Sequence, residues 1–403
     1  MTLAGPAAPQ AVARASWLRL YNQVSATLVV VGTAAALTTG FVVLAANRLV
    51  SGRPVALWEA ALPALTSVLA LFAATLLGLS LMQPWLWVRR AAVLIAGLLV
   101  IAIPAAAGRA ATGLVVGAPA LASVSLGAAF WLTIACAALA LVDALRRTEA
   151  GATTQLLTVA LIIAALASMA EAGLFDALSL AREYASRREA FAAATLRHLA
   201  LVAGAIGPAL LIGVPLALVA LRRRRFEAAL FAVLNLLQTI PSIALFGLLI
   251  VPLSGLASAV PALGAVGVAG VGPAPAIIAL VLYALLPIAR STLEGIAGVP
   301  AATIDAATGM GMTRRQVFWQ VEVPLSLPVL LAGLRIVTVQ AIGLAVVAAL
   351  IGAGGLGGFV FEGLGQYATD LVLLGALPAI AMALAADFLL RLLASALRAR
   401  FAP

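Results

Sequence analysis

Residues that could carry catalytic chemistry are scarce in this chain of 403 residues. It has one cysteine, Cys136, one histidine, His198, and no lysine. A phosphate-binding loop of the G-x-x-x-x-G-K-[ST] type uses its lysine to reach the phosphates, so the chain is not expected to hydrolyse ATP by that route. One cysteine and one histidine also leave too few ligands for a metal site. The sequence therefore predicts no enzyme activity, no metal and no cofactor.

The polar residues of interest instead interrupt long apolar runs. An arginine near the centre of a membrane helix costs about 2.5–3.5 kcal/mol on insertion scales, and polar groups at such depth usually face the interior of a helix bundle. The residues that could line a path for a solute on this basis are Asn235, Gln238, Tyr283, Arg335 and Gln340. The alternative for each is a hydrogen bond between helices, often worth about 0.6 kcal/mol. Asp387 and Arg391 are four residues apart on one predicted helix, and we expect them to neutralise each other.

The elements that must position these residues are membrane-spanning helices. The hydrophobic fraction is 65% and the charged fraction is 9%, whereas soluble domains carry about 25% charged residues. Because about 20 apolar residues cross a bilayer, ten segments qualify: 24–46, 57–81, 91–107, 119–144, 153–173, 199–220, 228–253, 274–290, 325–352 and 370–393. The apolar runs are continuous rather than alternating, which favours helices over strands. We predict an all-α integral membrane protein with about ten transmembrane helices.

The distribution of arginine predicts the orientation. With both termini in the cytoplasm, most arginines fall in cytoplasmic segments, as the positive-inside rule requires. The net charge of +10 is not taken as a nucleic-acid surface, because the arginines form small groups between apolar runs. Four of the outer arginines lie in segment 174–198. That segment is predicted either to lie along the membrane surface as an amphipathic helix or to form a solvated loop helix.

The longest predicted cytoplasmic segment, 291–324, carries the clearest local signals. Ser291 with Glu294 fits a capping box, and Thr313 with Gln316 fits a second one. These signals predict an ordered helical hairpin. The hairpin is interpreted either as a docking surface for a partner or as a connecting loop that folds on itself.

The same segment resembles the EAA signature of binding-protein-dependent ABC permeases. That signature is E-A-A, three residues, G, nine residues, and I-x-L-P, and the matching residues here are Asp305, Ala306, Ala307, Gly311 and the run Val321 to Pro324. The spacing agrees throughout, while Asp305, Val321 and Val323 depart from the signature conservatively. The resemblance implies that this hairpin couples to a cytoplasmic ATPase subunit. Arg314 and Arg315 then either pair with acidic groups of that ATPase or anchor the chain at the cytoplasmic face.

Residues 183–403 resemble the glycine betaine, choline and carnitine permeases more broadly. The similar stretches include His198-Leu199, the run Gln238 to Ser242 and the run Leu350 to Gly357. The resemblance implies a five-span ABC permease core over 178–403, with coupling loop 291–324, in the bacterial cytoplasmic (inner) membrane. Residues 1–177 exceed that core and are predicted to form an N-terminal transmembrane extension of about five helices.

The resemblance also implies partners and a substrate class. The partners are cytoplasmic ABC ATPase subunits, an extracytoplasmic substrate-binding protein, and a second copy of the permease or a related shorter permease, all within membrane lipid. The implied solute is an osmoprotectant of the glycine betaine or choline type. The alternatives are an ABC permease for methionine, a sulfonate or another small solute, and an ion-coupled secondary transporter, which would need intramembrane acidic residues.

Overall fold

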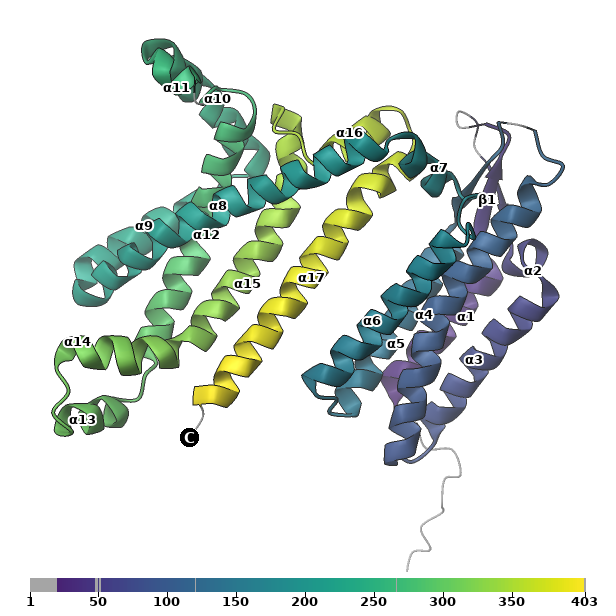
Figure 1. The fold of residues 1–403 in the computed structure, drawn as a ribbon, viewed down its shortest axis with the longest axis horizontal. Helices are drawn as coiled ribbons and strands as arrows, with labels where there is room; N and C mark the ends of the chain where they lie inside the picture. Colours follow the sequence, from purple (N-terminus) through teal and green to yellow (C-terminus); the bar gives the residue numbers. More distant parts are fainter. Residues whose placement is uncertain (1–19, 48–49, 51, 120, 266, 402–403) are drawn as a thin grey trace, which may run out of the picture. The chain divides into compact units, whose positions relative to one another are not determined.

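The computed structural model describes residues 20–47, 50, 52–119, 121–265 and 267–401, so Arg14 and Arg19 lie outside the described residues. The chain divides into two compact units, Met1–Ala181 and Arg182–Pro403. Figure 1 shows that each unit is built mainly from long helices. In the part of the chain that the structure describes, nine helices are long and apolar enough to cross a membrane. An all-helical membrane protein is thereby confirmed.

Unit 1 is a helical bundle capped at one end by a small sheet. Its helices are α1 (Gln23–Thr38), α2 (Leu57–Ala60), α3 (Pro63–Leu81), α4 (Leu86–Val115), α5 (Ala128–Arg147) and α6 (Ala152–Glu171). Its core is apolar and centres on Phe41, Leu76, Ile103 and Phe130, all buried. Small side chains on α4, including the fully buried Ala106 and Ala107, allow neighbouring helices to pack closely.

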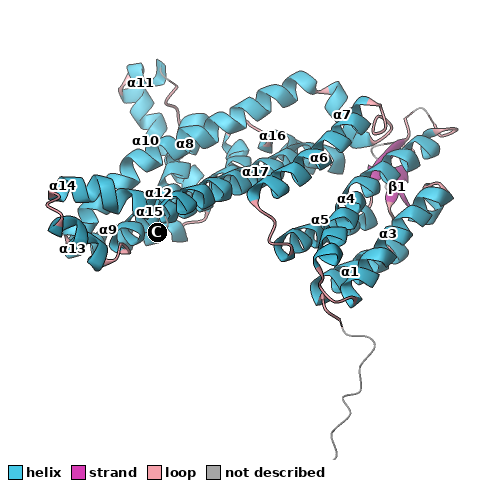
Figure 2. Cartoon of the chain, turned by 60° about the horizontal axis from the view of Figure 1, so that its bottom comes forward, coloured by secondary structure: helices cyan, strands magenta, loops and turns pink. Residues whose placement is uncertain are grey.

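Three short strands form the sheet, which Figure 2 shows in magenta beside the helix ends. They are β1 (Val42–Ala45), β2 (Arg53–Val55) and β3 (Ser123–Leu126), in the order β2-β1-β3. Both pairings are antiparallel, and Val42 lies opposite Val55 on one side and Leu126 on the other. The predicted first span, 24–46, included β1, and the predicted fourth span, 119–144, included β3, so the limits of both spans were wrong. The helix that was expected to reach residue 46 ends at Thr38.

Unit 2 begins near α7 (Ser179–Ser186) and holds the longest helices. These are α8 (Arg188–Arg222), α12 (Pro273–Ala297), α15 (Val323–Val347) and α17 (Thr369–Phe401). Shorter elements join them: α9 (Arg224–Thr239), α10 (Ser242–Ala259), α11 (Pro261–Ala265), α13 (Ala301–Gly309), α14 (Arg314–Val317), α16 (Gly357–Gly365), a π-helical turn (Phe318–Glu322) and a 3-10 turn (Ala348–Ile351). The core is formed by α8, α12 and α15, with buried Leu201, Leu280, Ile288 and Val337.

The predicted seventh span, 228–253, is corrected by the structure. It is divided at Ile240 and Pro241 into α9 and α10, because proline lacks the amide hydrogen that would continue the α9 hydrogen-bond ladder. The candidate span is then α10, which extends to Ala259. Residues 254–259, which lie beyond the predicted seventh span, therefore belong to a helix long and apolar enough to cross a membrane.

The first predicted span is also shorter than expected. Helix α1 has 16 residues and does not reach the length of the nine candidate spans. The third and eighth predicted spans are longer than expected, since α4 has 30 residues and α12 has 25. The prediction of about ten helices therefore holds as an approximate number, although the first and last residues of several helices differ from the predicted ones.

Candidate functional site: the α13–α14 hairpin and the polar contacts of unit 2

Helices α13 and α14 with the turn between them form a hairpin, hereafter the α13–α14 hairpin, at one end of unit 2 (Figure 1). Pro300 is the N-cap residue of α13, and its fixed φ suits a helix start. The side chain of Ala307 is buried against the hairpin, and its carbonyl accepts a hydrogen bond from the Met312 amide at 3.2 Å. Val317 of α14 is also buried. The small side chain of Ala307 therefore lies at the contact that closes the hairpin.

Gly311 forms the turn of this hairpin. Its φ is +86°, a conformation that side chains other than glycine rarely adopt, and no atom lies within 4 Å of where a Cβ would stand. Thr313 then starts α14 with the predicted capping box, in which the Gln316 amide donates to the Thr313 hydroxyl and the Thr313 amide donates to the Gln316 side chain. The positive φ of the backbone, rather than steric contact with neighbouring atoms, thus favours glycine at position 311.

The other predicted capping box is wrong. Ser291 lies inside α12, which continues to Ala297, and its hydroxyl donates to the Ile288 carbonyl. Ser291 and the buried Thr292 face the core, and Gly333 of α15 lies so close that a Cβ there would overlap Ser291. Local sequence could not distinguish a new helix start from a close contact between two long helices.

The hairpin exposes both charged and apolar side chains. Asp305, Ala306, Arg314 and Arg315 are exposed. The apolar Met310 next to the turn is 78% exposed, and Trp319, in the π-helical turn that follows α14, is 60% exposed. Pro324 does not end the element, because it lies in the first turn of α15, where its missing amide hydrogen costs no hydrogen bond. The hairpin is therefore joined rigidly through the π-helical turn to a long membrane helix.

Gln238 and Tyr283 are brought together by the break between α9 and α10. The Gln238 side-chain amide donates to the Tyr283 carbonyl at 2.6 Å, and the Tyr283 hydroxyl donates to the Ile240 carbonyl. Ile240 directly follows α9, so the Tyr283 hydroxyl satisfies a backbone carbonyl where that helix ends, while Gln238 reaches a carbonyl within α12. Asn235 is exposed and Gln340 is half-buried, and neither side chain forms a hydrogen bond with a described residue.

Arg335 does not stand alone within its helix. Its Nε lies 3.4 Å from Asp387 Oδ1 across the contact between α15 and α17, and Arg391 donates to the other carboxylate oxygen of Asp387. The expected Asp387–Arg391 pair is present and gains a third member. Two arginines therefore share the carboxylate of Asp387, which links α15 to α17.

A packed corner after α15 contains polar contacts that sequence reasoning did not predict. His198 is completely buried, and its Nε2 lies 3.2 Å from the Ile342 carbonyl. Gly355, with φ of +83°, lies against it, because a Cβ there would stand 3.2 Å from His198 Nδ1. The neighbouring Arg197 donates to the Ala353 carbonyl at 3.1 Å. Gly354 and Gly355 therefore permit close packing of this corner on α8.

Comparison with known proteins identifies both parts of the chain. Residues 209–399 match the family described as binding-protein-dependent transport system inner membrane component. Residues 21–181 match the N-terminal domain of the ABC transporter permease YehY. The carnitine transport permease protein OpuCB of Listeria monocytogenes is 40% identical over 196 residues, which are 49% of this chain and 83% of that protein. The chain belongs to the binding-protein-dependent ABC permeases.

Other permeases of this family are similarly close. The osmoprotectant import permease protein OsmW of Salmonella typhimurium is 40% identical over 49% of this permease and 87% of its own length. The choline transport system permease protein OpuBB of Bacillus subtilis is 36% identical over 49% and 83%. The permease is accordingly a multi-pass protein of the bacterial inner membrane and a transport component.

Two solved transporters align with about half of this permease. The MetNI methionine ABC transporter, in an inward-facing conformation, aligns with a TM-score of 0.41 and 22% identity over 51% of this chain and 97% of that chain. An amino acid ABC transporter crystallised with histidines aligns with a TM-score of 0.43 and 17% identity over 53% and 96%.

Proposed function

We propose that this permease imports a small quaternary-ammonium osmoprotectant, of the glycine betaine, choline or carnitine type, using ATP hydrolysed by a partner subunit. The observation that carries the proposal is the 36–40% identity to permeases named for these solutes over most of their length. The chain has no lysine with which to build a P-loop of its own. The energy for transport is therefore assigned to cytoplasmic ATPase subunits, and solute capture to an extracytoplasmic binding protein.

The α13–α14 hairpin is proposed as the element that docks on the ATPase. The hairpin exposes the apolar Met310 and the charges of Asp305, Arg314 and Arg315, and Trp319 is exposed in the π-helical turn that follows it. An apolar centre with a charged rim is a common composition for a protein interface. The continuous path from α14 into α15 supports the transfer of a hairpin movement to the membrane helices, as alternating access requires.

Residues 178–403 are proposed as the permease core and residues 1–177 as an N-terminal extension, with both termini in the cytoplasm. The core would act as a dimer with a second copy or a related shorter permease. Within it, Asn235, Gln238, Tyr283, Arg335 and Gln340 are the proposed polar contacts of the solute path. The contacts above divide this set: Gln238, Tyr283 and Arg335 are held by other protein groups, whereas Asn235 and Gln340 remain available to a solute.

Uptake by proteoliposomes tests the proposal. The permease is reconstituted with the ATPase and binding protein encoded beside it, and accumulation of labelled glycine betaine is measured with internal ATP. We expect uptake that vanadate abolishes and that excess choline or carnitine reduces. Uptake of methionine or a sulfonate in place of glycine betaine would overturn the substrate class. Uptake driven by an ion gradient without ATPase would overturn the importer mechanism.

A further inference from the structure

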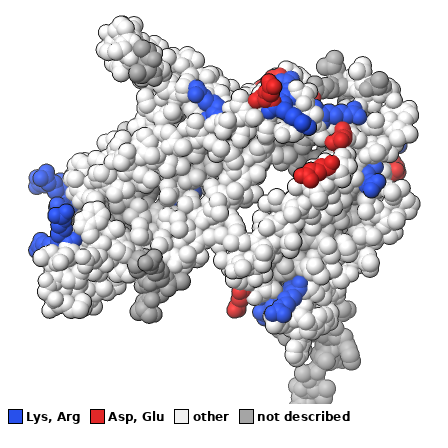
Figure 3. Space-filling view, in the orientation of Figure 1, with Lys and Arg blue, Asp and Glu red and all other residues white. Residues whose placement is uncertain are grey.

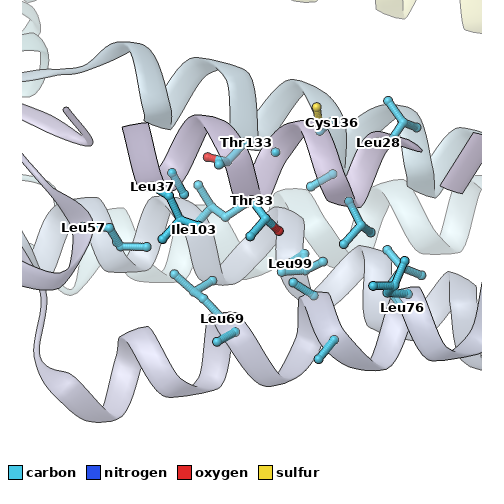
Figure 4. A pocket seen from close by; sticks show the side chains of 18 of the residues that line it. Leu28, Thr33, Leu37, Leu57, Leu69, Leu76, Leu99, Ile103, Thr133 and Cys136 are labelled. Atoms are coloured by element: carbon cyan, nitrogen blue, oxygen red, sulfur yellow. The ribbon is translucent and has the colours of Figure 1, made fainter. Parts of the chain in front are cut away.

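Unit 1 contains an apolar cavity of about 400 Å³ between α1, α3, α4 and α5. Figure 4 shows side chains from all four helices around it, among them Thr33, Leu69, Leu99 and Cys136. A cavity of this size is in the range of small-molecule sites, and apolar cavities stay free of water. In a membrane-spanning bundle, the medium that can enter such a cavity is hydrocarbon.

The shape of the cavity matches one lipid chain. Its lining on α3 extends from Thr66 to Leu77, which is about 17 Å of helix at 1.5 Å per residue. One leaflet of the hydrocarbon core is about 15 Å thick. In Figure 4 the lining runs along the helices, with Leu57 near one end and Leu76 toward the other. The cavity is therefore long enough for most of an acyl chain lying parallel to the helices.

A second, smaller pocket of about 40 Å³ shares the lining residue Leu76 with this cavity and is lined by both apolar and polar side chains. Its charged lining residues are Arg89 and Arg147. Arg147 pairs with Asp143 at 2.8 Å, and Asp143 also accepts from the Asn22 side chain at 2.8 Å. Arg89 donates instead to the carbonyls of Pro84 and Arg147, at 3.0 and 2.9 Å. Among the described residues Arg89 has no carboxylate partner, so the pocket keeps a net positive charge.

The position of this pocket suits a lipid headgroup. It lies where α1 and α4 begin and α3 and α5 end, the end of unit 1 at which Figure 3 shows charged side chains at the bottom of the view. Arg90 and Arg146 are also at this end and exposed, which the positive-inside rule assigns to the cytoplasmic leaflet. Basic pockets between membrane helices on that side are typical sites for anionic headgroups, and a guanidinium is well shaped for phosphate.

We propose that unit 1 binds one anionic phospholipid, with its phosphate at Arg89 and one acyl chain in the cavity between α1, α3, α4 and α5. This site differs from an ordinary lipid-facing groove because an apolar cavity lies beside Arg89, which has no carboxylate partner among the described residues. An ordinary groove would select neither headgroup charge nor one position along the helices.

Photocrosslinking tests the proposal on the full chain. The permease is placed in phosphatidylcholine nanodiscs with a small fraction of phosphatidylglycerol that carries a diazirine on one acyl chain, and labelled peptides are mapped by mass spectrometry. We expect labelling of the α3 and α5 segments around Ala73 and Cys136 to exceed labelling of α6, which has no buried residue, by at least fivefold. Unlabelled phosphatidylglycerol should compete, whereas added phosphatidylcholine and free glycerol phosphate should not.

Matched variants separate the two halves of the site. Arg89→Gln should abolish the preference for phosphatidylglycerol, whereas Arg90→Gln, on an exposed neighbour that does not line the pocket, should retain it. Ala73→Phe should fill the cavity and reduce labelling there at least fivefold, whereas Leu71→Phe, exposed on the same helix, should not. Labelling of α3 and α6 to the same extent, or competition by phosphatidylcholine equal to that by phosphatidylglycerol, would overturn the proposal. Labelling unchanged by Arg89→Gln would do so even if Ala73→Phe fails to fold.

Discussion

The two units of this permease place their polar side chains differently. In unit 1 the charged groups, such as Arg89 and Asp143, lie at helix ends, and the interior between the helices is apolar. In unit 2 polar groups connect the membrane helices themselves, through Arg335–Asp387 and His198–Ile342. The hydrogen bond between Asn22 and Asp143 joins α1 and α5 only near their ends, so the interior of unit 1 is held by packing. The polar contacts between the helices of unit 2 can be exchanged for others, which suits the two packings that the proposed alternating access requires.

The largest expected effect on the contrast between the two units comes from a substitution in the turn of the α13–α14 hairpin. Gly311→Val places a β-branched side chain at φ of +86°, which costs at least 1–2 kcal/mol. We expect ATP-dependent uptake in proteoliposomes to fall about tenfold or more, with normal membrane insertion. Gly309→Val is the matched control, because Gly309 is helical and also has open space around it. Equal uptake by the two variants would contradict a coupling role for the hairpin.

Removing the shared carboxylate should have the next largest effect. Asp387→Asn leaves Arg335 and Arg391 without their common partner. Because polar contacts between membrane helices contribute about 0.6 to 1.7 kcal/mol, we expect about 1–2 kcal/mol lower stability in a detergent unfolding titration. Asp387→Glu should restore most of it. An unchanged unfolding midpoint for Asp387→Asn would mean that the two arginines are solvated independently.

A cap in unit 1 should change stability without changing transport. The Asn22 side chain accepts from the Ser25 amide at 3.0 Å at the start of α1 and also donates to Asp143. Asn22→Ala should cost about 1 kcal/mol, detected as faster hydrogen exchange in α1 and α5. Uptake should stay within twofold of the parent. A large loss of uptake would break the contrast, since it would make unit 1 part of the moving machinery.

The smallest expected effect concerns one hydroxyl group in unit 2. Tyr283→Phe removes the hydrogen bond to the Ile240 carbonyl where α9 ends, at a cost of about 0.6 kcal/mol. We expect a small decrease in the thermal unfolding temperature and faster exchange at the α9–α10 break. Tyr367→Phe, at a side chain that is 94% exposed, is the control. A larger effect from Tyr367 than from Tyr283 would show that the break is not held by this bond.

The sequence alone determined that this protein lies in a membrane, that it is helical, and that the segment 291–324 contains a helical hairpin. These properties depend on local composition and on contacts between near neighbours: apolar runs long enough for a bilayer, the Thr313–Gln316 capping box and a glycine at the turn. The same local information placed helix limits poorly. Strand β1, which follows α1, is as apolar as that helix, so hydropathy could not separate the strand from the helix.

Only the tertiary structure decided which side chains meet. It paired Arg335 with Asp387, tied Tyr283 to the carbonyl at the end of α9, and buried His198 beneath Gly355. It also placed the apolar cavity beside the pocket at Arg89, and residues of α1, α3, α4 and α5 line both. Such contacts depend on how helices pack across tens or hundreds of residues. Spacing along one helix specifies which side chains share a face, but not what that face will touch.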